Sequence, residues 1–438
     1  MNLISFKSSL PGSFSYFGLL FCLLATPAVD LVAQSAIAVK KELVWFRAGN
    51  EISSPQFSDD GSRIVFVTRV HVADGHEAES LPESYFKKIE ERQKKEPRFA
   101  DPIIEMIDVQ GKVVCEASYG WNPSIAPDGN AIVFSAQQKP ITGFRVLAET
   151  QAGNDIELRD CEKKQTTVLA QPDPREYLDT PRFLTDGTSV SYSVNRAVNG
   201  AYGDAVGLER IDLLKHEKTV LLSQERVSNV PCPAKDSAQL SGHQAFVCSQ
   251  FGNATSGDFP QILFQTVASG EQLIALLGKP IPSPGDMYLA SSYEFQLASL
   301  WPERREILSL GKLGIGSIGN LSIQAATGDR VMIFSEYWKP FSTRTHEWLP
   351  DVGPRNAKQR SVYSPDGKHY LAAEPADEPT HFVLYETANG RKLFTFPRMV
   401  EVDEAVWSSD SKSLAMIVLA KTAPGVAYRE ELVVYSLP

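Results

Sequence analysis

Short apolar runs alternate with polar turns along most of the chain, and one motif recurs among them. Each copy has an apolar run, a Ser-x-Asp-Gly-like turn and a second run rich in β-branched and aromatic residues. The copies are centred on Asp60-Gly61, Asp128-Gly129, Asp186-Gly187 and Asp366-Gly367, with a weaker copy at Asp410-Ser411. Asp-Gly between two such runs is typical of a β-hairpin, because glycine accepts the positive φ of a tight turn.

Two more strand-like runs follow most of the hairpins, so the chain divides into units of four short strands. Units of about 40 to 60 residues with four strands each are typical of β-propeller blades, which bury both faces against their neighbours. We therefore predict an all-β fold, a single β-propeller of four-stranded blades. The hairpin count favours eight blades; two hairpins are degenerate, so seven blades is the next choice and six the third.

The degenerate hairpins are those of the fifth and sixth units, and the units around them and the chain ends decide how the ring is built. The fourth unit lacks the Asp-Gly turn and is expected to begin at Gln244–Cys248, and the fifth is expected over Met287–Leu310. The last unit shows three strands, and Glu42–Phe46 has no hairpin partner. Because an unclosed ring would expose a strand edge, we predict that Glu42–Phe46 is the outer strand of the last blade; the alternative is an extended leader.

Residues 1–38 are expected to form an export signal. Phe17–Ala28 is an apolar run too short to cross a bilayer, which suits a signal peptide, and small residues follow it. Cleavage is expected after one of three alanines, Ala28, Ala36 or Ala38. The segment before the apolar run is only weakly basic, so an uncleaved membrane anchor is the alternative. We expect an exported protein, periplasmic or extracellular.

The rest of the chain, residues 39–438, is expected to form the propeller, with one helical insertion at about 70–101. Within that insertion Leu81–Lys95 has helical texture, with Pro82 near its start and Glu90 four residues before Lys94. No later run is long and apolar enough to cross a membrane, so no stable membrane span is expected after signal removal.

Charge and composition narrow the range of partners. The net charge is −10 and the pI about 5.4, which argues against nucleic acid and anionic membrane surfaces as partners. We expect a monomer whose partner is a cell-envelope protein or a small or polymeric ligand.

Four cysteines remain after the signal, and an even count in an exported chain permits disulfides. Cys232 and Cys248 lie nearly symmetrically about a turn expected at Asp236–His243, which would place them opposite each other in a hairpin. We therefore predict a possible disulfide between Cys232 and Cys248, with two buried thiols as the alternative. Cys115 and Cys161 are paired only by elimination.

The repeated motif, Pro-x-Phe/Trp-Ser-x-Asp-Gly-x-x-Ile-x-Phe, resembles the WD40-like repeat of TolB-type β-propellers. Four copies match it well and Trp407-Ser408-Ser409-Asp410 matches in part. The resemblance covers most of the chain after the signal and implies the propeller fold. TolB itself carries an α/β domain before the propeller, for which the chain has no room ahead of Ser53. Prolyl-oligopeptidase relatives add a hydrolase domain, which is not expected here.

The histidines and the turn aspartates are the candidate metal ligands and catalytic groups of the sequence. The sequence has no Cys-x-x-Cys or His-x-x-x-His spacing, and His71, His76 and His346 are scattered in loops. The aspartates of the Asp-Gly turns are expected to cap the turns through side-chain hydrogen bonds. We predict no metal, no other cofactor and no catalytic residues.

The long loops connect the second and third strands of their units and are expected to elaborate one face. Their ranges are Arg69–Pro102, Gln137–Asn154, Asn195–Asp204, Ser249–Phe259, Glu336–Pro350 and Lys421–Arg429. Loops on a rigid scaffold carry binding, and aromatic side chains dominate interface anchors. We predict that aromatic residues of these loops form the ligand or partner face. They are Phe144, Tyr202, Phe251, Tyr337, Trp338, Phe341 and Trp348.

These observations favour an exported, non-catalytic binding scaffold that acts in protein or ligand binding through its long-loop face. The alternative is a carbohydrate-acting or metal-dependent propeller enzyme with a site at the central channel.

Overall fold

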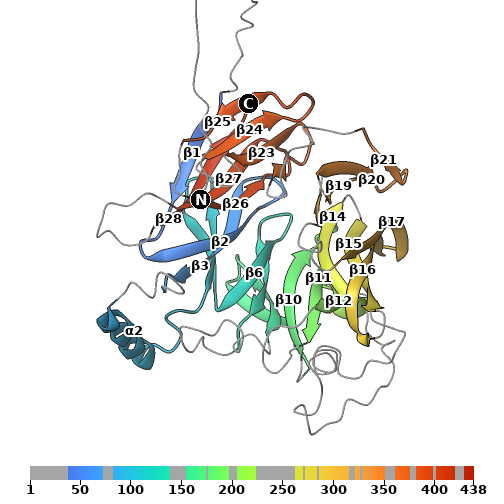
Figure 1. The fold of residues 1–438 in the computed structure, drawn as a ribbon. Helices are drawn as coiled ribbons and strands as arrows, with labels where there is room; N and C mark the ends of the chain where they lie inside the picture. The colour runs from blue at the N-terminus through green and yellow to red at the C-terminus, as the bar shows by residue number, and fades with distance from the viewer. Residues whose placement is uncertain are drawn as a thin grey trace, which may run out of the picture. The chain divides into compact units, whose positions relative to one another are not determined.

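The computed structural model describes residues 38–438 except for fourteen stretches. These are 73–81, 139–153, 174–175, 197–204, 223–261, 270–271, 284–285, 315–320, 326–328, 336, 351–360, 375–380, 398–400 and 420–428. The described strands form seven four-stranded antiparallel sheets, which we number in chain order as sheets 1 to 7 (Figure 1).

Sheets 1 to 3 take their strands in sequence order, from the innermost strand outward. Sheet 1 contains β2 (Asn50–Phe57), β3 (Arg63–Val70), β4 (Ile103–Asp108) and β5 (Val113–Ser118). Sheet 2 contains β6 (Gly120–Ile125), β7 (Ala131–Ala136), β8 (Asp155–Asp160) and β9 (Gln165–Ala170). Sheet 3 contains β10 (Glu176–Phe183), β11 (Ser189–Arg196), β12 (Ala205–Asp212) and β13 (Glu217–Leu222).

Sheets 4 to 6 follow the same order. Sheet 4 contains β14 (Ile262–Ser269), β15 (Gln272–Ser283), β16 (Asp286–Trp301) and β17 (Arg305–Gly314). Sheet 5 contains β18 (Ser322–Ala325), β19 (Arg330–Phe334), β20 (Trp338–Ser342) and β21 (Glu347–Trp348). Sheet 6 contains β22 (Val362–Tyr363), β23 (His369–Glu374), β24 (His381–Glu386) and β25 (Lys392–Thr395).

Sheet 7 joins the two ends of the described chain. Its strands are β26 (Glu401–Trp407), β27 (Ser413–Leu419), β28 (Glu430–Ser436) and β1 (Lys40–Trp45), and β1 pairs antiparallel with β28. The prediction that the N-terminal strand completes the last blade is confirmed. Across the closing seam, the carboxylates of Glu430 and Glu404 accept hydrogen bonds from the backbone N–H groups of Ile52 and Ser54, at 2.5 and 2.9 Å.

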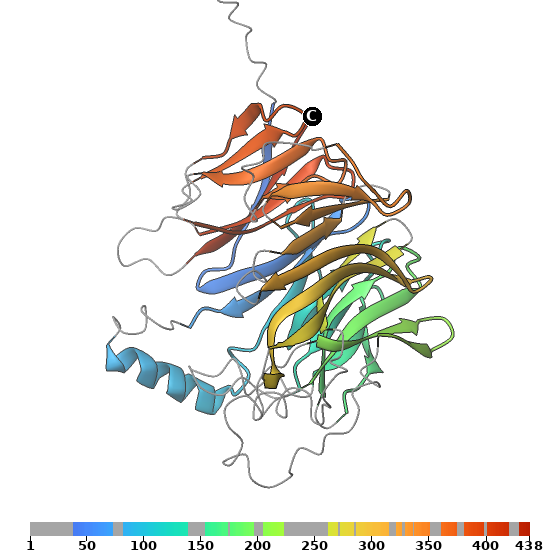
Figure 2. The ribbon, with the colours of Figure 1, turned by 45° about the vertical axis from the view of Figure 1, so that its right-hand side comes forward.

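Burial explains why the sheets close into one propeller. Among the described residues, seven hydrophobic clusters lie between successive sheets, one for each neighbouring pair, including sheets 7 and 1. The alternation along β3 shows the cause: Ile64 and Phe66 pack towards sheet 7, whereas Val65 and Val67 pack towards sheet 2. Each central strand therefore buries both faces, as expected for a blade. Neighbouring sheets can be followed in Figure 2.

The Asp-Gly turns are capped as predicted. In the first, Asp60 Oδ1 accepts hydrogen bonds from the Ser58 hydroxyl at 2.7 Å and the Ser62 backbone N–H at 3.0 Å, while Gly61 has φ of +70°. Asp128, Asp186, Asp366 and Asp410 accept equivalent bonds from the residue two positions later. The turn aspartates are structural groups, since their oxygens are engaged within their own turns.

The described strands form seven blades, which was the second choice from sequence, and the favoured count of eight was wrong. The fourth and fifth expected units are one sheet, in which β15 and β16 form a hairpin of 12-residue and 16-residue strands. Pro280 and Pro282 lie within β15. Because proline is rare inside a strand, the sequence of this long hairpin resembles the boundary between two blades. The first strand expected for the fourth unit, Gln244–Cys248, lies outside the described residues.

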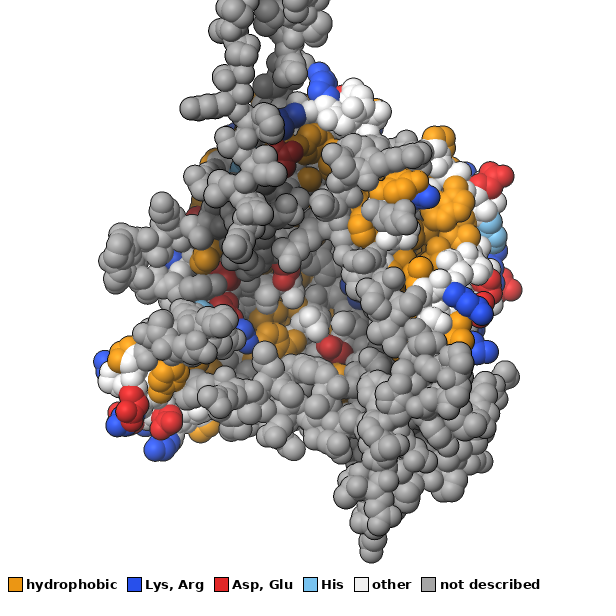
Figure 3. All heavy atoms as spheres, viewed as in Figure 1, with side chains coloured by type: hydrophobic (Ala, Val, Ile, Leu, Met, Phe, Trp, Pro, Cys, Tyr) orange, Lys and Arg blue, Asp and Glu red, His pale blue; other side chains and the backbone are white. Residues whose placement is uncertain are grey.

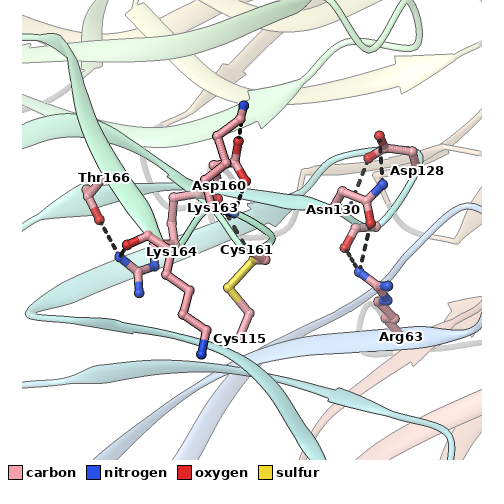
Figure 4. The surroundings of a disulfide bond; sticks show 11 residues. Arg63, Cys115, Asp128, Asn130, Asp160, Cys161, Lys163, Lys164 and Thr166 are labelled. Atoms are coloured by element: carbon pink, nitrogen blue, oxygen red, sulfur yellow. Dashed lines mark hydrogen bonds and ion pairs between the residues drawn. A yellow bond between two sulfur atoms is a disulfide. The ribbon is translucent and has the colours of Figure 1, made fainter.

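A disulfide joins sheets 1 and 2. Cys115 of β5 is bonded to Cys161, which follows β8, with 5.3 Å between their Cα atoms (Figure 4). The same sheets are also joined by the Arg63 guanidinium, which donates to the Gly129 carbonyl and, at 3.1 Å, to Asn130 Oδ1. The pairing reached by elimination is therefore formed; the predicted pair Cys232 and Cys248 lies outside the described residues.

The insertion between β3 and β4 contains α2 (Glu83–Lys95), close to the range expected from sequence. None of its residues is buried, so the helix does not form part of the core. Across the described residues, the structure contains no helix of sufficient length and hydropathy to cross a membrane.

Candidate functional site

The two ends of the sheets differ in how they are connected. At one end, the first and second strands of a blade are joined by tight turns such as Ser58–Ser62 and Leu184–Thr188. Some turns of neighbouring blades are also bonded to each other. Ser411 Oγ, for example, accepts a hydrogen bond from the Asp366 backbone at 2.9 Å. The insertion holding α2 lies at the other end, which we call the insert end. Connections at the insert end, such as that between β3 and β4, are longer than the tight turns and can carry side chains away from the strands.

A set of charged and aromatic residues gathers at the insert end of sheets 1 and 2. These residues come from strand ends and from the segment that follows α2, and we call them the insert-end cluster. They are Glu51, Arg69, His71, Arg98, Tyr119 and Trp121.

Glu51 organises the sheet 1 side of this cluster. Its carboxylate accepts hydrogen bonds from Arg69 Nε and from His71 Nδ1, the latter at 2.7 Å. Burial acts to raise the pKa of Glu51, but the His71 hydrogen bond and the Arg69 charge outweigh it, and the pKa is lowered. Glu51 is therefore an ionised carboxylate at neutral pH that holds the side chains of Arg69 and His71 in place.

Arg69 connects this group to an aromatic ring of sheet 2. Its guanidinium carbon lies 5.7 Å from the ring centroid of Trp121, within the range of a cation–π interaction. The Trp121 indole N–H donates to Gln137 Oε1 at 3.1 Å, which fixes the ring orientation. Trp121 is half-buried, so one part of the ring remains accessible.

Arg98 performs the matching role on the segment after α2. Its guanidinium carbon lies 4.1 Å from the Tyr119 ring centroid. Its Nη1 lies 3.4 Å from a carboxylate oxygen of the buried Asp101. Arg98 also donates to the backbone carbonyl of Gln138 at 2.6 Å. Tyr119 is 39% exposed, so the cluster presents a rigidly held aromatic ring to solvent.

Further carboxylates at the same end are engaged in hydrogen bonds between sheets 2 and 3. Asp179 Oδ1 accepts from the Asn122 side-chain amide at 2.7 Å and from the Ser135 hydroxyl at 3.0 Å. Within sheet 2, Asp155 accepts from Gln138 Nε2 at 2.5 Å. These bonds hold neighbouring inner strands at fixed spacing, which gives the cluster a rigid base.

The aromatic residues predicted for the ligand face are separated by the structure. Phe144, Tyr202 and Phe251 lie outside the described residues. The range expected to be one long loop, Glu336–Pro350, instead contains β20, a four-residue turn and β21.

Two of the predicted rings are core residues, which corrects their assignment to a surface. Trp338 is 2% exposed and Phe341 is fully buried, and both lie on β20. Trp338 packs into the cluster between sheets 5 and 6, and Phe341 into that between sheets 4 and 5. Their apolar rings fill blade interfaces because β20 is a central strand.

Tyr337 and Trp348 remain accessible at the outer part of sheet 5. Trp348 is 47% exposed and contacts the buried Phe341 edge-on at a centroid distance of 5.3 Å. The Lys339 ammonium lies 4.5 Å from the Tyr337 ring centroid and 5.8 Å from that of Trp348. These residues form a small patch that the structure places on a different sheet from the insert-end cluster.

The insert-end cluster was missed from the sequence. Arg69 and Arg98 fall inside the expected loop Arg69–Pro102, whereas Tyr119 and Trp121 fall between two expected blades, so the cluster joins separate predicted segments. A signal existed in the placement of arginine and aromatic residues directly beside strand ends, as at Arg69, Arg98 and Tyr119. His71 was noted only as a scattered histidine, and its contact with Glu51 requires the β2–β3 pairing, in which Glu51 lies opposite Arg69.

Metal binding finds no support in the part of the chain that the structure describes. Within it, no group of three or more His, Cys, Asp or Glu side chains could hold a metal ion. In the view of Figure 3, the molecule is hollowed where Figure 1 labels β6 and β10, and acidic and apolar side chains border the hollow.

Comparison with known proteins gives fold likenesses at low sequence identity. No family model matches the chain, and no curated protein matches it by sequence. The chain is similar to the β-propeller domain of the Trilobed protease from Pyrococcus furiosus, with a TM-score of 0.48 and 9% identity over 89% of this chain and 94% of that one.

Two other solved structures show comparable likeness. One is an oligogalacturonate lyase in complex with manganese, with a TM-score of 0.47 and 12% identity over 91% of this chain and 98% of that one. The other is the acylaminoacyl peptidase of Pyrococcus horikoshii, with a TM-score of 0.44 and 11% identity over 87% of this chain. The match covers 51% of the peptidase, so the chain spans about half its length.

Proposed function

We propose that the protein is an exported, TolB-like β-propeller that binds a cell-envelope protein through its insert end and performs no catalysis. The observation that carries this proposal is the insert-end cluster. It places an exposed tyrosine and a half-buried tryptophan beside two arginines. The scaffold is a ring of blades that the pairing of β1 with β28 closes. Tyrosine, tryptophan and arginine are the residues most often found at the energetic centres of protein interfaces.

Export is supported by the bonded pair Cys115–Cys161, because disulfides persist in oxidising compartments. Residues 1–38 would act as the signal, and the mature protein would be periplasmic or extracellular. N-terminal sequencing of the protein recovered from the producing cells tests this: a start after Ala28, Ala36 or Ala38 supports export. A start at Met1 in the cytosolic fraction would overturn it.

A photo-crosslinking amino acid tests the binding surface. We would place it at Tyr119 and, as a matched control, at the exposed Val220 of β13, which lies on the outer strand of sheet 3. After incubation with cell-envelope extract, Tyr119 should give a discrete cross-linked protein and Val220 should not. The same species must weaken in Arg98→Ala, which removes the cation over the Tyr119 ring.

Equal cross-linking at both positions, or none at Tyr119, would overturn the insert-end assignment. The catalytic alternative, a metal-dependent or carbohydrate-acting site at the central channel, predicts metal bound in a 1:1 ratio by the purified protein. Elemental analysis measures it directly, and a stoichiometric metal would favour that alternative over a non-catalytic scaffold.

A further inference from the structure

Neighbouring innermost strands are joined by side chains that accept backbone hydrogen bonds. Gln56 Oε1 accepts from the Ile125 N–H at 3.2 Å, and Ser124 Oγ accepts from the Phe183 N–H at 3.2 Å. Two further steps use Gln265, which accepts from Ile323 at 2.8 Å, and Gln324, which accepts from Tyr363 at 3.2 Å. All four acceptors are uncharged amides or hydroxyls, whereas two other links between inner strands use the carboxylates of Glu404 and Asp179.

Arg182 departs from this pattern. It occupies the middle of Pro181-Arg182-Phe183, the position held by Gln56 and Ser124 in their copies of the motif. A guanidinium has only donors, so it cannot accept the backbone hydrogen bond that its counterparts accept. It is also the one basic residue in the sequences of the seven innermost strands, which contain six carboxylates.

The surroundings of Arg182 are unusual for a charged group. Its side chain is exposed to solvent by accessible area, yet the surrounding protein is dense enough that desolvation lowers the pKa of the guanidinium. Since Arg182 lies on an innermost strand and its side chain is exposed, it is accessible to a ligand at the inner strands. Among the described residues the Arg182 side chain has neither a hydrogen bond nor an ion pair. The nearest acid in its strand, Asp179, is occupied by Asn122 and Ser135.

A second donor lies on the next inner strand. Leu184 at the end of β10 and Leu263 of β14 belong to the same core cluster, which brings this part of β10 near the segment that carries Gln265. Gln265 is exposed, and its Oε1 is used by the Ile323 N–H. Its Nε2 group makes no hydrogen bond among the described residues and is a donor on the inner strand of the sheet next to that of Arg182.

We propose that Arg182 binds the oxyanion group of a ligand, a carboxylate or a phosphate, in the space enclosed by the innermost strands, with the Gln265 amide as second donor. A planar guanidinium binds such groups through two parallel hydrogen bonds. The ligand enters from the end of the tight turns, because Arg182 lies two residues before the turn that begins at Leu184. This site is separate from the insert end and does not depend on the function proposed there.

The test compares the wild-type protein with Arg182→Gln, which restores the amide found at Gln56. Thermal unfolding is measured in chloride, in phosphate and in acetate or citrate at constant ionic strength. A ligand that binds the folded state raises Tm with its concentration. Phosphate, or the carboxylates, should raise the Tm of the wild type, and Arg182→Gln should bind the same anion at least about tenfold more weakly. The anion that acts identifies which oxyanion is recognised.

A second readout separates binding from folding. In chloride, Arg182→Gln should match or exceed the wild type in Tm, because it removes a desolvated charge without a partner. Arg305→Gln is the matched control: Arg305 is exposed on the outer strand β17, and its variant should respond to anions like the wild type. Equal anion responses in all three proteins, or no response in the wild type to either anion class, would overturn the proposal.

Discussion

Cys115 and Cys161 join the outermost strand of sheet 1 to the turn after β8 of sheet 2, at a sequence separation of 46 residues. The bond lies outside the hydrophobic cluster's centre, where Val65, Ile104 and Ile132 are fully buried. Packing therefore fixes the inner and middle strands, while the disulfide holds the outer edge of the same interface. The hydrophobic packing and the disulfide therefore stabilise different parts of the same interface between blades.

Removing this bond should lower the free energy of unfolding. Closing a loop of this length stabilises a protein by about 3 to 4 kcal/mol in the chain-entropy account. We expect Cys115→Ser to lose most of that amount in denaturant unfolding. Cys115→Ser/Cys161→Ser should lose no more than the single variant, because one cysteine alone cannot form the bond. A double variant within about 0.5 kcal/mol of the wild type would contradict the prediction.

Ring closure should depend on the side chains of β1 that face the core. Trp45 contacts the fully buried Phe66 of sheet 1 at a centroid distance of 4.7 Å, whereas its neighbour Val44 is 37% exposed. Trp45→Ala should destabilise the protein by about 2 to 4 kcal/mol, because a large partly buried ring is lost. Val44→Ala should cost less than about 0.5 kcal/mol. Equal losses would show that β1 contributes through its backbone alone.

The parts of the fold that could be predicted from sequence are those that depend on residues close together in the chain. Asp-Gly turns recur because each needs a positive φ and an aspartate to cap it, so the hairpins at Gly61, Gly129, Gly187 and Gly367 were found directly. The closing strand followed from a strand without a partner at one end and a blade lacking a strand at the other. Neither inference required knowledge of tertiary packing.

The blade count and the site depend on packing, which a single sequence does not display. Pro280 and Pro282 are tolerated in β15 because the hairpin with β16 continues through them, with Pro280 opposite Tyr293 and Pro282 opposite Ala290. Tryptophan is common at protein interfaces, but Trp338 lies on a central strand and packs between two blades. Arg69 and Trp121 come from different sheets, so their contact could be seen only in three dimensions.

The insert-end cluster should make stability depend on acidic pH through Glu51. Its folded pKa is lower than that of the unfolded chain, which is about 4.3. The ionised carboxylate therefore contributes stability above that value, and this contribution is lost as the pH falls through the folded pKa. Glu51→Gln should be less stable than the wild type by about 1 kcal/mol at pH 7. The difference should shrink as the pH is lowered from about 4.5.

Denaturant unfolding across pH 2 to 7 measures this difference, and an exposed acid provides its control. Glu83 of α2 pairs with Lys87 at 3.1 Å, but both side chains are mostly exposed. Glu83→Gln should run parallel to the wild type, because exposed pairs contribute little. A constant gap between Glu51→Gln and the wild type down to pH 2 would show that Glu51 acts through packing and not through its charge.

Ser411 allows the cost of the left-handed turn position to be measured. It stands where four other turns have glycine and has φ of +62°, and its hydroxyl accepts the Asp366 N–H of sheet 6 at 2.9 Å. Ser411→Ala keeps the strained φ and loses the hydrogen bond, so it should cost about 1 kcal/mol. Ser411→Gly loses the same bond but relieves about 1 kcal/mol of strain, so it should lie within about 0.5 kcal/mol of the wild type. Thermal unfolding of both variants decides the matter: if Ser411→Gly is as unstable as Ser411→Ala, the serine is held for the bond between blades and the φ costs little.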